Sequence, residues 1–283
     1  MNATVQPTAQ FATINGLQIH YLDWGNAGKP PMLLLHGIAR TARNFDHVAA
    51  QLAQHYHVIA VDMRGHGDSG WHPQGAYLVE DYTSDIEALI EQLGFEQLGL
   101  RKLVLWGAST GGRVAQMIAG RHPDWISAVV VEDVGPERPA TVSNRRGERM
   151  AKEANGWASV DELLAKIRVE HPRMPEALAR HFALHAAKTR DDGRLVWKRD
   201  PAILNGFIPT ALWSTVLKIK APIIYVLGGL SHIVPPETQQ ALQTQLPQAQ
   251  IVMMPGLGHY PSDENPPAFV AVVERFLAIV KDS

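Results

Sequence analysis

The chain has 283 residues, of which 46% are hydrophobic and 19% charged, and its formal net charge is −2. This length can bury one full core with an insertion, and the small charge gives no electrostatic reason to expect nucleic acid or a membrane surface as partner. The lack of cysteine excludes disulfides and thiol chemistry. With no signal segment and no apolar run of membrane-spanning length, we expect a cytoplasmic protein; oligomeric state is not indicated.

The first half of the chain alternates strand and helix patterns. Phe11–Ile14 and Leu17–Asp23 flank Asn15-Gly16, which is typical of a hairpin turn. Strand-like apolar runs then alternate with helical patterns, which predicts a doubly wound α/β sheet. The expected strands are Met32–Leu35, Val58–Asp62, Leu103–Trp106 and Ile126–Glu132, and the expected helices are Phe45–Gln54, Tyr82–Leu93 and Gly112–Arg121.

A serine lies between two glycines directly after the apolar run that starts at Leu103. Gly107-Ala108-Ser109-Thr110-Gly111 matches Gly-x-Ser-x-Gly, which marks a nucleophile elbow when it joins a strand to a helix. Such a turn forces the serine into strained dihedral angles, so its neighbours must lack bulky side chains. Ser109 is therefore the candidate nucleophile, and the alternative is a glycine-rich loop that happens to contain a serine.

Two adjacent acids, Glu132 and Asp133, end the next strand. Catalytic groups gather at the carboxyl edge of an open α/β sheet. Strand alternation points the two side chains to opposite faces, so only one of them can reach a given histidine. We favour Asp133 because its shorter side chain is the more rigid, while the alternative is a structural carboxylate that caps the turn Val134–Pro136.

Between residues 135 and 216 the strand pattern disappears and charged, helix-forming segments follow. The sequence predicts a helical cap over 135–216, inserted into a core formed by 1–134 and 217–283. Such a cap excludes water and builds the substrate pocket. The expected cap helices are Arg145–Asn155, Val160–Glu170 and Pro175–Lys188.

Several residues are candidates for the wall of a substrate pocket. Arginines within one or two helical turns of the cap could clamp a substrate carboxylate, or could form an ordinary solvated helix face. The aromatic and basic residues close to the site motifs could line the acyl side or belong to the core. These candidates are Arg145, Arg146, Arg149, Trp106, Tyr260, Arg40 and Trp213.

A histidine follows the last strand-like run, Ile251–Met254, in the segment Pro255–Pro261. The loop Gly256-Leu257-Gly258-His259-Tyr260 places His259 where a general base is expected. Serine early and histidine late is also the chain order found in α/β-hydrolases, and it differs from that of trypsin-like and subtilisin-like enzymes. His259 is therefore the candidate base.

The segments around Ser109 and His259 resemble those of the α/β-hydrolase superfamily. Two further segments share this resemblance: the turn Arg64-Gly65-His66-Gly67-Asp68-Ser69, and the apolar run Pro31–Leu35 followed by His36-Gly37-Ile38. The resemblance covers nearly the whole chain. The resemblance implies a mostly parallel, eight-stranded sheet with an inserted helical cap. It also implies an oxyanion hole formed by the backbone amides of Ile38 and Thr110.

The usual triad acid of this superfamily is missing. The matching stretch, Gly228–Pro235, has His232 at the carboxylate position, flanked by Ser231. Asp133 is the expected substitute, and this displaced acid resembles the arrangement in acetamidomethylene-succinate hydrolases. Glu132, or a serine–histidine dyad without an acid, remains an alternative.

The expected function is that of a serine hydrolase that cleaves a small carboxylic ester, lactone or amide through an acyl-enzyme on Ser109. We expect a small acyl substrate as partner and neither a metal nor an organic cofactor. A carbon–carbon bond hydrolase that uses the same serine and histidine is an alternative. The vacancy at the usual acid position also leaves open a lyase or a ligand-binding member of the fold.

Overall fold

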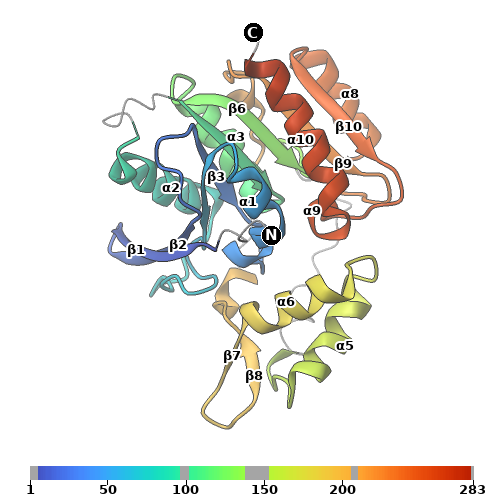
Figure 1. Cartoon of the computed structure of the whole chain (residues 1–283). Coiled ribbons are helices and arrows are strands. Elements are labelled where there is room, and N and C mark those ends of the chain that lie inside the picture. The colour runs from blue at the N-terminus through green and yellow to red at the C-terminus, as the bar shows by residue number, and fades with distance from the viewer. Residues whose placement is uncertain (1–5, 96–101, 138–152, 205–209, 282–283) are drawn as a thin grey trace.

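The computed structural model describes residues 6–95, 102–137, 153–204 and 210–281 (Figure 1). Eight strands of this part form one sheet in the order β1-β2-β4-β3-β5-β6-β9-β10. The β1–β2 and β2–β4 pairs are antiparallel and the other neighbours are parallel, which confirms the predicted sheet. The strands are β1 (Thr8–Ile14), β2 (Leu17–Asp23), β3 (Pro31–Leu35), β4 (His57–Val61), β5 (Leu103–Ala108), β6 (Ile126–Glu132), β9 (Ile223–Gly228) and β10 (Ala249–Met254).

Helices cover both faces of the sheet, and strand alternation explains why. In β3, Leu33 and Leu35 pack with residues of α2, α3 and α8, whereas Met32 and Leu34 pack with residues of α1 and α10. Full burial of one such side chain contributes about 1.5–3 kcal/mol, so the two layers stabilise the sheet from both sides. These helices are α1 (Asp46–Leu52), α2 (Val79–Leu93), α3 (Thr110–Arg121), α8 (Pro236–Gln245) and α10 (Pro266–Lys281).

The segment between β6 and β9 contains α5 (Val160–Glu170), α6 (Glu176–Ala186) and α7 (Trp213–Val216). Figure 1 shows α5 and α6 next to one another, away from the layers that cover the sheet. The two longer helices share a small core of their own, which includes Leu163 and Phe182. Farther along the chain, the short helix α9 (Pro261–Glu264) precedes α10. The division into a core and a cap at residues 135 and 216 remains a prediction.

One element of this segment differs from the expectation of helices alone. The chain leaves α6 at Ala186 and forms the hairpin β7 (Ala187–Thr189) and β8 (Leu195–Trp197). Its turn is the segment Asp191-Asp192-Gly193, where Gly193 has a φ of +80°. The sequence predicted only helices in this segment, because three-residue strands give almost no alternation to detect. Residues 145–152 of the expected first cap helix lie outside the described residues.

No helix among the described residues is both long and apolar enough to cross a bilayer.

Candidate active site

Ser109 lies at the turn from β5 into α3, with φ 50° and ψ −115°. A residue other than glycine costs about 1–3 kcal/mol in such a conformation, so its surroundings must enforce it. A Cβ atom on Gly107 would lie 2.2 Å from Gly111 O, and one on Gly111 would lie 2.1 Å from Leu35 O. The two glycines therefore allow the close backbone approach that holds the serine at the carboxyl edge of the sheet.

His259 faces Ser109 from the loop between β10 and α9. Its Nε2 lies 3.0 Å from Ser109 Oγ, and its side chain is 29% exposed. The Gly258 amide donates a 2.7 Å hydrogen bond to Glu264 Oε2, which ties this loop to the end of α9. An imidazole in this position can take the serine proton.

Asp133 lies on the other side of the histidine. Its Oδ2 is 2.7 Å from His259 Nδ1, and its side chain is only 1% exposed. The Asp133 backbone has a φ of +48° directly after β6, which is unusual for a residue other than glycine. The structure thus brings together Ser109, His259 and Asp133, three residues that are far apart in the sequence.

The segment that usually supplies the acid here supplies hydrogen-bond donors to Asp133. The Gly228 amide donates to Asp133 Oδ1 at 2.9 Å, and the Ser231 hydroxyl donates to Oδ2. His232, at the position where the acid is expected, is exposed. The sequence did not assign this role to Ser231, although a hydroxyl beside an empty acid position is a signal that could have suggested it.

Glu132 points to the opposite face, as strand alternation predicted. Its Oε1 accepts a 2.8 Å hydrogen bond from the Ser262 amide, and its Oε2 lies 3.3 Å from Trp106 Nε1. Burial raises the pKa of the Glu132 carboxyl to about 8, against the lowering effect of its hydrogen bonds with Ser262. Glu132 therefore anchors the first turn of α9, and Asp133 is the acid that meets His259.

The loop after β3 passes beside the elbow. A Cβ on Gly37 would lie 3.1 Å from Ser109 Cβ, so Ile38, the next residue, follows directly at the site. His36 holds this loop: Nε2 accepts from the Met63 amide at 3.0 Å, which leaves Nδ1 to donate to Gly37 O at 2.8 Å. Burial lowers the pKa of His36, consistent with this neutral tautomer.

Thr110 is the first residue of α3, and the first amides of a helix have no acceptor within the helix. Its N–H is thus available at the elbow. The geometry is compatible with an oxyanion hole formed by the amides of Ile38 and Thr110.

Tyr260 and Arg40 lie together next to the loop after β3, His36-Gly37-Ile38. The Tyr260 hydroxyl occupies the space next to Gly37, only 2.5 Å from where a Cβ would be. Burial raises the pKa of Tyr260, while hydrogen bonds with Arg40 and Ser109 act in the opposite direction. The Arg40 guanidinium lies 4.2 Å from the centre of the Tyr260 ring, 4.6 Å from that of Phe182 on α6, and 3.1 Å from Asp263. Arg40 is therefore held by a buried ion pair.

The other candidates for the pocket wall do not reach this site. Trp106 is fully buried, stacked on Phe269 at 4.8 Å and edge-on to Phe45 at 5.2 Å, because it lies on the opposite face of β5. Trp213 begins α7, which packs at the far end of α3, where Thr215 O approaches Gly120. Arg145, Arg146 and Arg149 lie outside the described residues.

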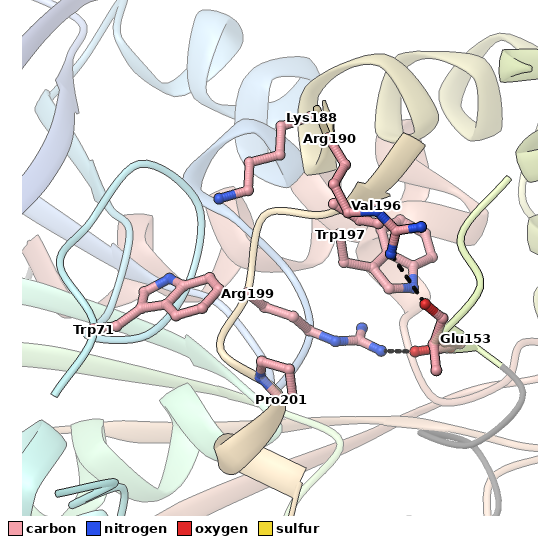
Figure 2. Close-up of a pocket in the computed structure, with 9 residues that line it drawn as sticks. Trp71, Glu153, Lys188, Arg190, Val196, Trp197, Arg199 and Pro201 are labelled. Atoms are coloured by element: carbon pink, nitrogen blue, oxygen red, sulfur yellow. Dashed lines mark hydrogen bonds and ion pairs between the residues drawn. The ribbon is translucent and has the colours of Figure 1, made fainter. Parts of the chain in front are cut away.

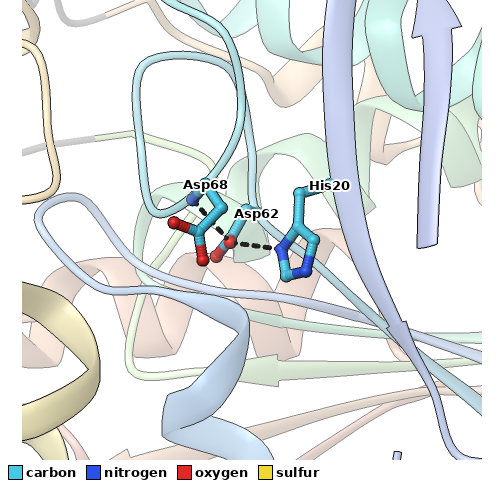
Figure 3. Close-up of side chains that lie close together, drawn as sticks. All are labelled: His20, Asp62 and Asp68. Atoms are coloured by element: carbon cyan, nitrogen blue, oxygen red, sulfur yellow. Dashed lines mark hydrogen bonds and ion pairs between the residues drawn. The ribbon is translucent and has the colours of Figure 1, made fainter. Parts of the chain in front are cut away.

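His20, Asp62 and Asp68 form a cluster with metal-ligating side chains near β2 (Figure 3). Asp62 Oδ2 already accepts from His20 Nδ1 at 2.7 Å and from the Asp68 amide at 3.0 Å. Its Oδ1 accepts from the Ala42 amide at 2.7 Å. Asp62 thus fixes the loop after β4 to the segment that follows Ile38, and three of the roughly four acceptor positions of its carboxylate are already used in this structural role.

Comparisons with known proteins agree with this architecture. The family model described as alpha/beta hydrolase fold matches residues 30–266. A sn-1-specific diacylglycerol lipase from Mus musculus is 28% identical over 93% of this chain and 85% of its own length. A 3-hydroxybutyrate-oligomer hydrolase from Cupriavidus necator is also 28% identical, over 90% of this chain and 91% of its own length.

Among solved structures, that of E-2-(acetamidomethylene)succinate hydrolase superposes with a TM-score of 0.81 at 23% identity, over 96% of this chain and 99% of the other. At this identity the superposition shows a shared fold. Several relatives are named lipases, esterases or hydrolases, which identifies an enzyme of the carboxylic ester hydrolase class. The chain belongs to the alpha/beta hydrolase family.

Proposed function

We propose that the chain is a serine hydrolase that cleaves a small carboxylic ester through an acyl-enzyme on Ser109. The observation that supports this most directly is the unbroken pair of hydrogen bonds from Ser109 Oγ through His259 to Asp133. A nucleophile, a base and a group that orients the base are the parts that acyl transfer requires. A lyase or a binding protein would not need the strained elbow that presents Ser109.

The proposed reaction begins when Ser109 Oγ attacks the substrate carbonyl carbon and His259 Nε2 takes the hydroxyl proton. Asp133 accepts the Nδ1–H bond and stabilises the imidazolium. The amides of Ile38 and Thr110 donate to the oxyanion, and the loss of one such donor typically costs about 2.7–4 kcal/mol. His259 then protonates the leaving alcohol, and a water activated by the same base releases the acid.

The proposed class of substrate is inferred from the names of the relatives. Diacylglycerol and 3-hydroxybutyrate oligomers, which appear in the names of two relatives, are both carboxylic esters. We therefore favour an ester over a lactone, an amide or a carbon–carbon bond. A cap over 135–216, a cytoplasmic location and the lack of a cofactor remain parts of the proposal.

The test is covalent labelling with a fluorophosphonate, followed by intact mass. We expect one adduct on the wild-type protein, none on Ser109→Ala, and one on Ser214→Ala, which removes an exposed serine of α7. Hydrolysis of p-nitrophenyl esters should be lost together with labelling. A wild-type protein that takes no label and cleaves no ester would rule the proposal out.

A further inference from the structure

A pocket lies beside the hairpin β7–β8, apart from the residues around Ser109 (Figure 2). Its volume is about 330 Å³, at the lower end of the range of about 300–1,000 Å³ typical of small-molecule sites. None of the residues that line it belongs to the site described above. The lining comes from the loop after β4, the segment before α5, the hairpin and the start of η2 (Pro201–Leu204).

The walls of this pocket are mainly apolar. Trp71 is 42% exposed in its loop, although a residue with an aromatic side chain of this size is normally buried. Trp197 and Val196 from β8 provide the facing apolar surface. A partly exposed tryptophan at the mouth of an apolar pocket offers a flat surface for the body of a small ligand.

The charges that line the pocket favour an anion. Three cationic side chains, Lys188, Arg190 and Arg199, face a single carboxylate, that of Glu153. Glu153 is already paired with Arg199 and lies 2.9 Å from Lys166 Nζ. Figure 2 shows Trp71 and Lys188 on one side of the pocket, while the Arg199 guanidinium reaches Glu153 on the other. The net positive charge of the pocket lining is therefore located on the side where Trp71 and Lys188 lie.

Lys188 is the cation best placed for a ligand. Its Nζ lies 5.0 Å from the centre of the Trp71 ring, and among the described residues no carboxylate pairs with it. Arg190, in contrast, is engaged with Asp192. An ammonium group above an indole ring can hold a carboxylate while the ring contacts the apolar part of the same molecule.

We propose that this pocket binds a small apolar carboxylate, with the carboxylate at Lys188 Nζ and the hydrocarbon between Trp71 and Val196. The aromatic walls select the apolar body, the excess of positive charge selects the anion, and the volume limits its size. Binding does not depend on the chemistry at Ser109, so the site can be tested whether or not the proposed function is correct.

The experiment is a calorimetric titration of octanoate into the Ser109→Ala protein, which cannot form an acyl-enzyme. Octanol is the matched uncharged ligand. We expect saturable binding of octanoate that is about fivefold weaker in Lys188→Gln, since an ion pair near the surface contributes up to about 1 kcal/mol. Trp71→Leu should weaken both ligands, and Lys218→Gln, at an exposed lysine elsewhere, should leave binding unchanged.

Two results would overturn the proposal. One is the absence of octanoate binding at millimolar concentration. The other is binding that is insensitive to both Lys188→Gln and Trp71→Leu, which would place the ligand elsewhere. Both substitutions are at exposed side chains, so the variants should fold, and circular dichroism checks this.

Discussion

At the carboxyl end of β6, Glu132 and Asp133 are consecutive in the chain but lie on opposite faces of the sheet, in very different surroundings. Asp133 receives three donors, from the Gly228 amide, the Ser231 hydroxyl and His259 Nδ1. Glu132 meets the amide and the hydroxyl of Ser262 and the Trp106 indole N–H, with the buried Asp263 carboxyl nearby and, among the described residues, no histidine. The face of the strand, and not the type of residue, thus decides which acid contacts His259 and which anchors α9.

The first way to test this contrast is Asp133→Asn. The amide cannot hold His259 in the required tautomer or stabilise its charged form, so we expect kcat/KM to fall by about 10³–10⁴. Ester hydrolysis at neutral pH measures the effect. Asp124→Asn, which changes an exposed aspartate, should retain full activity; a loss of less than tenfold in Asp133→Asn would remove Asp133 from the triad.

The second is Glu132→Gln, read through stability and not through activity. The pKa of Glu132 is raised from 4.5 to about 8 in the folded protein, so between these values the unfolded chain has lost a proton that the folded chain keeps. The free energy of unfolding therefore falls as the pH rises from about 4.5 to 8, and stays level above that.

Glutamine removes this dependence while it can still accept from the Ser262 amide. We expect the wild type to lose a few kcal/mol more than Glu132→Gln between pH 5 and 9, since one pKa unit corresponds to about 1.4 kcal/mol. Urea unfolding at both pH values measures the difference. If the free energy of unfolding changed equally with pH in the two proteins, the contrast would be contradicted. It would also be contradicted if Glu132→Gln lost as much activity as Asp133→Asn.

The smallest effect is expected at the vacant acid position. Ser231→Ala removes one donor from Asp133, and a hydrogen bond to a charged group contributes about 1.5–3 kcal/mol, so we expect kcat/KM to fall about tenfold. Ser231→Thr should restore activity.

His232→Ala is the matched control for Ser231→Ala, since His232 is exposed next to it, and it should stay within twofold of wild type. If the histidine variant lost more than the serine variant, the role assigned to Ser231 would be wrong.

The sequence predicted the parts of the fold and the site that depend on local pattern. The glycines around Ser109 and the apolar runs of β3, β5 and β6 indicated the elbow and the sheet directly. Asp133 could be inferred because alternation lets only one of the two acids reach the histidine, because its side chain is the shorter one, and because the usual acid position holds His232. The short hairpin β7–β8 could not, because three residues per strand leave no periodicity to read.

The sequence could not predict contacts between segments that are far apart in the chain. The hydrogen bond from Ser231 to Asp133 exists because β6 and β9 are neighbours in the sheet. Trp106 is close to Ser109 in the chain, yet the alternation of β5 turns it into the opposite layer. Arg40 follows shortly after Ile38 in the sequence, but only the folded chain reveals that Arg40 forms an ion pair with Asp263.

The contacts of Arg40 with Phe182 and Tyr260 connect α6 to the loop that carries His259. Phe182 belongs to α6, whereas Tyr260 directly follows His259, and the Arg40 guanidinium lies between the two rings. A cation between two rings is held more strongly when water is excluded. Movement of α6 away from the core would admit water to one side of Arg40 and loosen its hold on Tyr260. The order of the loop that carries His259 therefore depends on how α6 packs, although the two segments are far apart in the sequence.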